Sequence, residues 1–120
     1  FVMTGETGSY RFMAPEVFRH EEYSEKVDVY SFAMVTYNML HGAAPWAHLN
    51  GVAAAKAAAL DLDRPPVPRH WDARLAAILK DAWAADADAR PSFAQVLTRL
   101  GELDEGSKAA EAAGCNCAVS

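Results

Sequence analysis

The sequence has few of the large apolar residues that build a protein core. Val, Leu, Ile and Phe together supply only 24 of its 120 residues, whereas 25 residues are alanine. Alanine favours helix but buries little side-chain area, and so low a content of large apolar residues is close to the lower limit for a self-sufficient globule. The composition therefore favours a helical chain that depends on packing against something else.

Features that define several other classes of protein are also missing. Acids outnumber bases in both halves of the chain, the net charge is −5 and no run of Lys or Arg occurs, which argues against nucleic-acid binding. No apolar run approaches 18 residues, and the start at Phe1 has no basic segment typical of a signal peptide. The two cysteines, Cys115 and Cys117, are too close together for a disulfide framework, so we expect a reducing, cytoplasmic compartment.

Capping and turn residues divide the chain into about five helices, with no strand of clear apolar alternation. Ser24 and Gly42 are expected to bound the helix Glu25–His41, whose apolar side chains lie on every side. A helix of this kind is expected inside a larger body. The sequence predicts four further helices: Pro15–Arg19, Gly51–Leu60, Trp71–Ala85 and a last one from Ser92 to about Leu100.

Two of these helices carry a further expectation. The helix Gly51–Leu60 is rich in alanine and has few large side chains, so we expect it on the surface. Gly101 is expected to end the last helix. Residues 102–120 are small and polar and are expected to form a disordered tail.

Four short motifs occur in a fixed order and identify the chain more closely. They are Gly8-Ser9-Tyr10-Arg11-Phe12-Met13-Ala14-Pro15-Glu16, Asp28-Val29-Tyr30-Ser31-Phe32, Gly42-Ala43-Ala44-Pro45-Trp46 and Asp88-Ala89-Arg90-Pro91-Ser92. In this order they resemble the C-terminal part of the C-lobe of a eukaryotic protein kinase, where A-P-E ends the activation loop. The segment from Thr4 to Glu16 is most similar to the plant and algal Raf-like kinases of the tyrosine-kinase-like group.

The resemblance implies the C-terminal helical subdomain of the protein-kinase-like fold, with residues 1–101 as a partial kinase domain. It also implies that Glu16 forms a buried ion pair with Arg90; from the residues alone, two solvated surface charges are the alternative. It implies that Asp28 accepts backbone N–H bonds from a catalytic loop. The alternative for Asp28 is an acid that interacts favourably with the positive end of the helix dipole.

The resemblance further assigns the segment before the first helix to substrate docking. Gly8, Ser9 and Phe12 match the substrate-docking loop, in which the Ser9 hydroxyl would meet a catalytic Asp and Lys; a turn-forming serine is the alternative. Thr4 and Thr7 are candidate phosphosites, since a phosphate adds about −1.5 to −2 charges and can order a loop. Two solvated loop threonines are equally compatible with the sequence.

The nucleotide-site motifs of a kinase do not occur in these 120 residues. There is no G-x-G-x-x-G, no V-A-I-K, no H-R-D and no D-F-G, and the four histidines are scattered without metal-ligand spacing. The resemblance implies ATP, Mg²⁺ and a protein substrate for an intact family member, but for this chain we expect no catalytic residue, no metal and no cofactor. Two hypotheses remain: a fragment of a Ser/Thr kinase whose catalytic half lies upstream, or a non-catalytic interaction module derived from a kinase C-lobe.

The last four residues form a separate motif. Cys117-Ala118-Val119-Ser120 match C-a-a-X, which with a final Ser favours farnesylation of Cys117, and Cys115 could carry a palmitoyl group. Two lipids bind a membrane surface much better than one, although the acidic residues upstream would be repelled by an anionic leaflet. An unmodified tail is the alternative.

Overall fold

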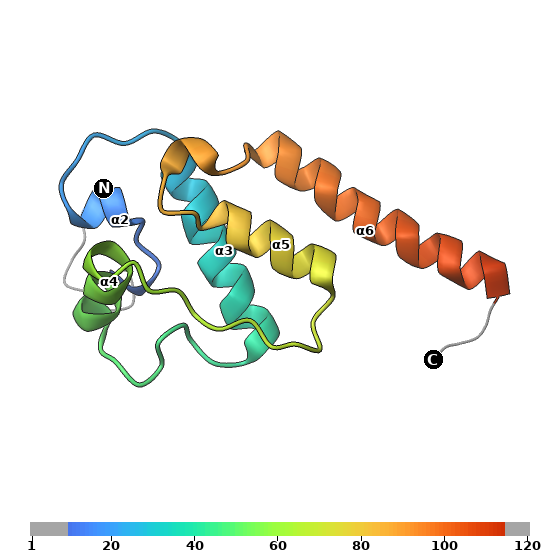
Figure 1. The fold of residues 1–120 in the computed structure, drawn as a ribbon, viewed down its shortest axis with the longest axis horizontal. Helices are drawn as coiled ribbons and strands as arrows, with labels where there is room; N and C mark the ends of the chain where they lie inside the picture. Colours follow the sequence, from blue (N-terminus) through green and yellow to red (C-terminus); the bar gives the residue numbers. More distant parts are fainter. Residues whose placement is uncertain (1–9, 115–120) are drawn as a thin grey trace.

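The computed structural model describes the backbone of residues 10–114 and the side chains of residues 10–103. This part of the chain is all-α, as predicted, with five α-helices, one short 3-10 turn and no strand (Figure 1). The elements in chain order are α2 (Pro15–Phe18), α3 (Lys26–His41), α4 (Gly51–Leu60), α5 (Ala73–Ala82), η1 (Ala87–Ala89) and α6 (Phe93–Gly114).

Helix α3 is the central element, and its boundaries follow from the residues that flank it. The Ser24 hydroxyl accepts a hydrogen bond from the Lys26 N–H at 3.2 Å, which satisfies one of the unpaired donors at the helix start. Gly42 ends the helix in the left-handed conformation, with φ of 86°, and its N–H donates to the Asn38 carbonyl. This conformation strains any residue with a Cβ, so glycine suits the position.

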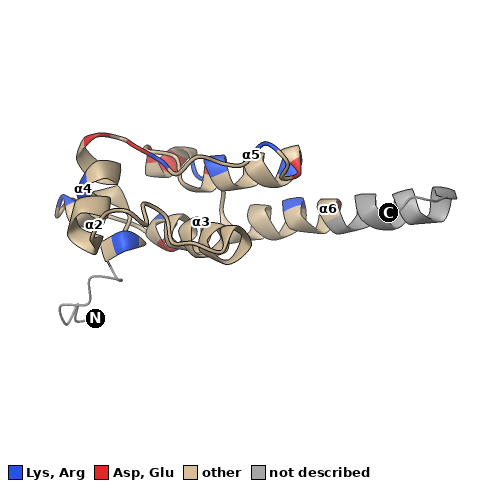
Figure 2. Cartoon of the chain, turned by 90° about the horizontal axis from the view of Figure 1, so that it is seen from below, with Lys and Arg blue, Asp and Glu red and all other residues tan. Residues whose placement is uncertain are grey.

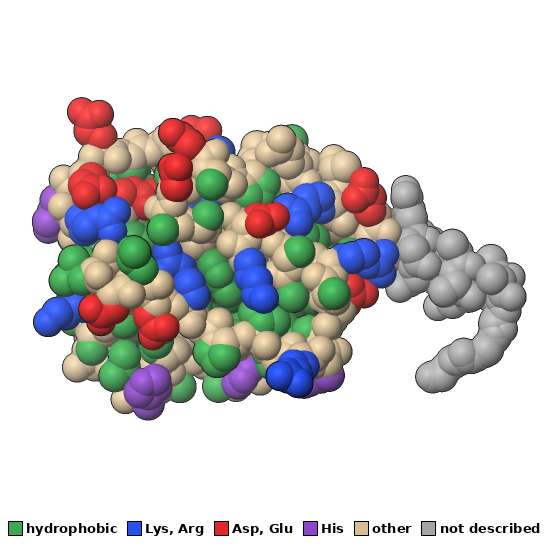
Figure 3. All heavy atoms as spheres, viewed as in Figure 1, with side chains coloured by type: hydrophobic (Ala, Val, Ile, Leu, Met, Phe, Trp, Pro, Cys, Tyr) green, Lys and Arg blue, Asp and Glu red, His purple; other side chains and the backbone are tan. Residues whose placement is uncertain are grey.

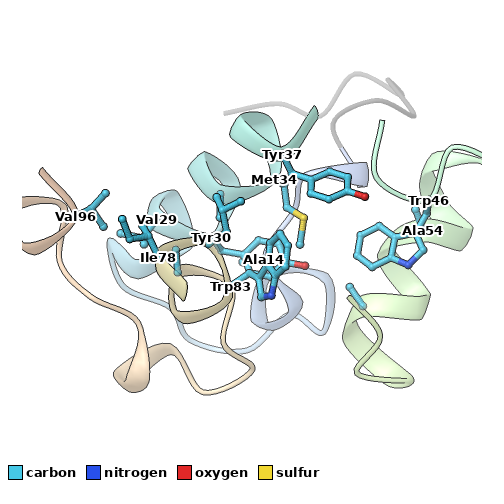
Figure 4. Packing of buried hydrophobic residues seen from close by; sticks show 14 residues of the cluster. Ala14, Val29, Tyr30, Met34, Tyr37, Trp46, Ala54, Ile78, Trp83 and Val96 are labelled. Carbon is cyan, nitrogen blue, oxygen red and sulfur yellow. The ribbon is translucent and has the colours of Figure 1, made fainter. Parts of the chain in front are cut away.

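The core is built around one side of α3. Its side chains meet those of Ala14, before α2, and of α5 and the residue that follows it (Figure 4). Figure 2 shows the ribbon of α5 lying alongside that of α3. The buried residues of α3 are Val29, Tyr30, Ala33, Met34 and Tyr37. The opposite side carries exposed apolar side chains, among them Val35 and Met39, the latter 69% exposed. The described part therefore covers only one side of the helix that the sequence placed inside a larger body.

Helix α4 lies at the surface, as expected, with Val52 and Leu60 exposed, but one face of it is buried. Gly51, Ala54, Ala55, Ala58 and Ala59 form this buried face, and the helix packs against α2. Side-chain size alone did not predict the buried face. Small side chains instead let two helices approach closely, and an alanine face becomes buried once a neighbour lies against it.

Helix α6 begins as predicted but does not end where predicted. The Ser92 hydroxyl accepts from the Gln95 N–H at 3.1 Å and the Gln95 side chain accepts from the Ser92 N–H at 2.8 Å, the reciprocal arrangement of a capping box. The helix then continues through Gly101 to Gly114, so residues 102–114 are helical and not disordered. A single glycine costs a helix only about 1 kcal/mol relative to alanine, and the alanines at 109–113 favour continuation.

Two glycine substitutions test these two helix ends. Gly101→Ala should stabilise the chain by about 0.5–1 kcal/mol, because Gly101 lies inside α6 and a Cβ there meets no atom within 4 Å. Gly42→Ala should destabilise it by about 1–2 kcal/mol, because its φ is positive. Urea denaturation followed by circular dichroism measures both. A destabilising Gly101→Ala would mean that α6 ends at Gly101 after all.

Candidate functional site

A buried ion pair joins α2 to the segment between η1 and α6. Glu16 in α2 and Arg90 before α6 are 74 residues apart in the sequence. Both terminal nitrogens of the guanidinium donate to the carboxylate, Nη1 to Oε2 at 2.8 Å and Nη2 to Oε1 at 3.0 Å. Arg90 is 2% exposed and Glu16 is 6% exposed. The two-point geometry is the strong form of this interaction, so the structure brings together the two residues that the sequence analysis paired.

Two further donors of Arg90 are also satisfied. Its Nε donates to the Ala84 carbonyl at 2.8 Å and its Nη1 to the Lys26 carbonyl at 3.2 Å. In return, the Lys26 ammonium donates to the Arg90 carbonyl at 2.6 Å. One guanidinium therefore links α2, the start of α3 and the chain after α5, and a buried charge of this kind is tolerated only when it is so paired.

Two guanidinium groups pack against the ring of Tyr30. The Cζ atoms of Arg90 and Arg64 lie 5.2 Å and 5.4 Å from the centroid of its ring, within the range of cation–π attraction. Burial raises the pKa of Tyr30 to about 12 against the opposing effect of the two positive charges. Among the described residues, the Tyr30 hydroxyl and the Arg64 Nη2 have no hydrogen-bond partner.

The segment that enters α2 is held at two further points. The Arg11 guanidinium donates to the carbonyls of Pro45, Trp46 and Leu49 at 2.6–2.8 Å. The Ser31 hydroxyl of α3 donates to the Phe12 carbonyl at 2.7 Å. Sequence reasoning assigned no role to Arg11 or Lys26, because both donate to backbone carbonyls, and no residue type in the sequence marks such an acceptor.

The other predicted site residues are not brought into this cluster. Phe12 is half-buried against the core. Asp28 is exposed, and its carboxylate makes no hydrogen bond or ion pair with any residue of the described part. The candidates Thr4, Thr7, Gly8, Ser9, Cys115 and Cys117 lie outside the described residues.

Within the described residues, no group of three or more His, Cys, Asp or Glu side chains could hold a metal ion. No helix in the same part of the chain is long and apolar enough to cross a bilayer.

Comparison with known proteins identifies the family. The model of the protein tyrosine and serine/threonine kinase family matches residues 2–100, and the chain belongs to this family. It is 46% identical over 106 residues to the serine/threonine-protein kinase VIK of Arabidopsis thaliana, with 88% of this chain covered. It is 38% identical over 102 residues to STY17 of the same plant, another serine/threonine-protein kinase, with 85% covered. The alignments span 24% of VIK and 18% of STY17. The family match and the all-helical structure confirm the predicted kinase family and helical fold.

Replacing Arg90 tests the energetic weight of the buried pair. Arg90→Ala leaves the Glu16 carboxylate buried without its partner and should lower the free energy of unfolding by about 3–5 kcal/mol. This is a large fraction of the total free energy of unfolding of a small domain. Arg74→Ala is the matched control, because it removes an exposed ion pair with Asp72 and should leave the urea midpoint almost unchanged. Similar losses in the two variants would contradict the account.

The pH dependence of stability tests the same pair. Burial alone would raise the pKa of Glu16, but the hydrogen bonds and charge of Arg90 outweigh burial and leave the pKa below the 4.5 of an unperturbed glutamate. Because the pKa is lower in the folded state, the stabilisation is fully present above pH 4.5 and is lost as pH falls through the folded-state value. Glu16→Gln should therefore reduce the free energy of unfolding at pH 7 and remove part of its decline in acid. An unchanged acid limb would contradict this.

Proposed function

We propose that this chain is the C-terminal helical part of a kinase domain that transfers phosphate from ATP to Ser or Thr residues of proteins. Its own task is to hold the substrate-docking segment in place. The single observation that carries the proposal is the buried Glu16–Arg90 pair, formed by two residues from separate motifs within the stretch that matches the kinase family.

The contacts around residues 11–16 support this task. The Glu16–Arg90 pair fixes the end of the segment, and the Arg11 and Phe12 contacts fix its beginning. Phosphoryl transfer depends mostly on positioning and charge neutralisation, and a reacting hydroxyl must be held close to its final geometry. A segment tied to three elements suits the docking of a substrate at Gly8, Ser9 and Phe12.

ATP, when bound, supplies the phosphoryl group, and the residues that bind it in this proposal lie outside these 120. The chain spans about a quarter or less of the relatives that it matches. An upstream half of the kinase domain would also have a surface to contact. Apolar residues follow Asp28 along one stripe of α3 at helical spacing: Phe32, which is half-buried, and Val35 and Met39, which are exposed. Phe32 meets Phe93 of α6 edge-to-face at 5.8 Å, and Phe93 and Leu97 of α6 are exposed as well.

A chimera tests the proposal. This chain would replace its aligned segment in the Arabidopsis kinase VIK, and purified chimera would be assayed for transfer of labelled phosphate from Mg²⁺–ATP to casein. We expect Ser/Thr phosphorylation by the chimera and none by the 120-residue chain alone, since positioning groups without a nucleotide site catalyse nothing.

Two variants of the chimera serve as controls. Arg90→Ala should abolish activity together with cooperative melting, while Arg74→Ala, at an exposed pair, should retain activity. A chimera that is monomeric and melts cooperatively but transfers no phosphate would contradict the proposal.

A further inference from the structure

Tyr23 is the tyrosine of this chain whose side chain is open to another enzyme. All four tyrosines lie in the described part. Tyr10 is half-buried, and Tyr30 and Tyr37 are 0% and 3% exposed, whereas Tyr23 is 64% exposed. The Tyr37 hydroxyl also donates to the Pro66 carbonyl at 2.8 Å. A reagent that reacts with the folded chain at a phenolic hydroxyl therefore meets Tyr23 first.

The backbone around Tyr23 is open as well. Residues 20–25, in the loop between α2 and α3 at the upper left of Figure 1, are all exposed, and residues 21–24 belong to no helix. Within the described part, the N–H groups of residues 22–24 and the carbonyls of residues 21–23 make no hydrogen bond to other main-chain groups. A segment with free main-chain groups can lie in the cleft of an enzyme and pair with its backbone.

The surroundings of Tyr23 are strongly acidic. Glu21 and Glu22 precede it directly, and Glu25 follows two residues later. A groove of about 520 Å³ runs beside it, between this loop and η1, and acidic side chains gather there at the upper left of Figure 3. Arg19 is the one basic residue in its lining, and it is already paired with Glu21 at 2.9 Å. The charged residues of the lining are Glu16, Arg19, Glu21, Glu22, Asp86 and Asp88.

We infer that Tyr23 is a phosphorylation site of a protein-tyrosine kinase whose substrate cleft is basic. Such a cleft attracts an acidic segment, whereas an acidic cleft would repel it. In the transfer, the Tyr23 Oη forms a bond to the γ-phosphorus of Mg²⁺–ATP, and the bond from that phosphorus to the β–γ bridging oxygen breaks. ADP leaves, and the phenolic proton passes to a carboxylate of the acting kinase. The inference does not depend on the function proposed for this chain.

Phosphate on Tyr23 is expected to weaken the fold near α2. It adds about −1.5 to −2 charges beside a groove that is lined by five carboxylates and one guanidinium that is already paired. The new charges repel those already there. Glu16 is one of the five, and its pair with Arg90 anchors α2. The modification therefore acts as a switch that lowers stability at this anchor.

Phosphorylation of the folded chain tests the assignment of the site. The 120-residue chain would be incubated with Mg²⁺–ATP and a purified protein-tyrosine kinase that phosphorylates poly(Glu,Tyr), and phosphopeptide mass spectrometry would locate the phosphate. We expect phosphate on Tyr23 and none on Tyr30 or Tyr37. An unmodified Tyr23, or equally rapid modification of the two buried tyrosines, would overturn the inference.

Charge variants test what the acting kinase recognises. Glu21→Lys combined with Glu22→Lys should slow the modification by about tenfold. Asp61→Lys combined with Glu102→Lys is the matched control, because both residues are exposed and the change in net charge is the same. The control should be phosphorylated at the parent rate. Equal rates for the two double variants would overturn the role of the acidic segment.

Urea denaturation tests the consequence of the phosphate. The phosphorylated chain should unfold at a lower urea midpoint, with an equilibrium constant for unfolding raised by about threefold or more. The difference should shrink in high salt and disappear when a tyrosine phosphatase removes the phosphate. Tyr23→Phe, incubated in the same way, should show no change. A midpoint that stays the same or rises on phosphorylation would overturn the switch.

The outcomes separate this inference from the proposed function. An active VIK chimera whose Tyr23 stays unmodified would overturn the phosphorylation site alone. An inactive chimera that is phosphorylated at Tyr23 would overturn the kinase proposal alone. If the isolated chain aggregates, the same modification of the chimera decides the question.

Discussion

The buried ion pair between Arg90 and Glu16 is the interaction on which the rest of the structure depends. It closes a loop of 74 residues, and the same guanidinium also donates to carbonyls at the start of α3 and after α5. A chain with 24 large aliphatic and Phe residues has little apolar area with which to fix these elements. A buried ion pair with additional hydrogen bonds can fix these elements by geometry, because a rearrangement would leave a charge unpaired in the interior.

The ion pair supports the proposed function because it anchors the segment that is proposed to dock the substrate. Arg11, Ser31 and Glu16 hold residues 11–16 against three different parts of the fold, so this segment has a fixed position in the described part of the chain. In the proposed function, that fixed position is what the segment contributes to substrate docking.

Elements set by local chemistry could be predicted from the sequence. Gly42 ends α3 because its positive φ favours glycine over residues with a Cβ, and Ser92 begins α6 through a capping box. The pairing of Glu16 with Arg90 followed from the family resemblance that the ordered motifs carry; the two residues alone were equally compatible with solvated surface charges. The buried face of helix α4 was missed because burial of alanine depends on a neighbour. The predicted end of α6 at Gly101 was too early because one glycine is a weak helix breaker. The roles of Arg11 and Lys26 were missed because their partners are carbonyls, which every residue carries.

The most direct test of the central claim is a double-mutant cycle on Glu16 and Arg90 in the 120-residue chain. Glu16→Gln, Arg90→Gln and the double variant would be compared by urea denaturation. A pair that holds the fold should show a coupling free energy of about 2–3 kcal/mol. Two single losses that simply add, with coupling below about 0.5 kcal/mol, would show that the two side chains do not act together and would contradict the account.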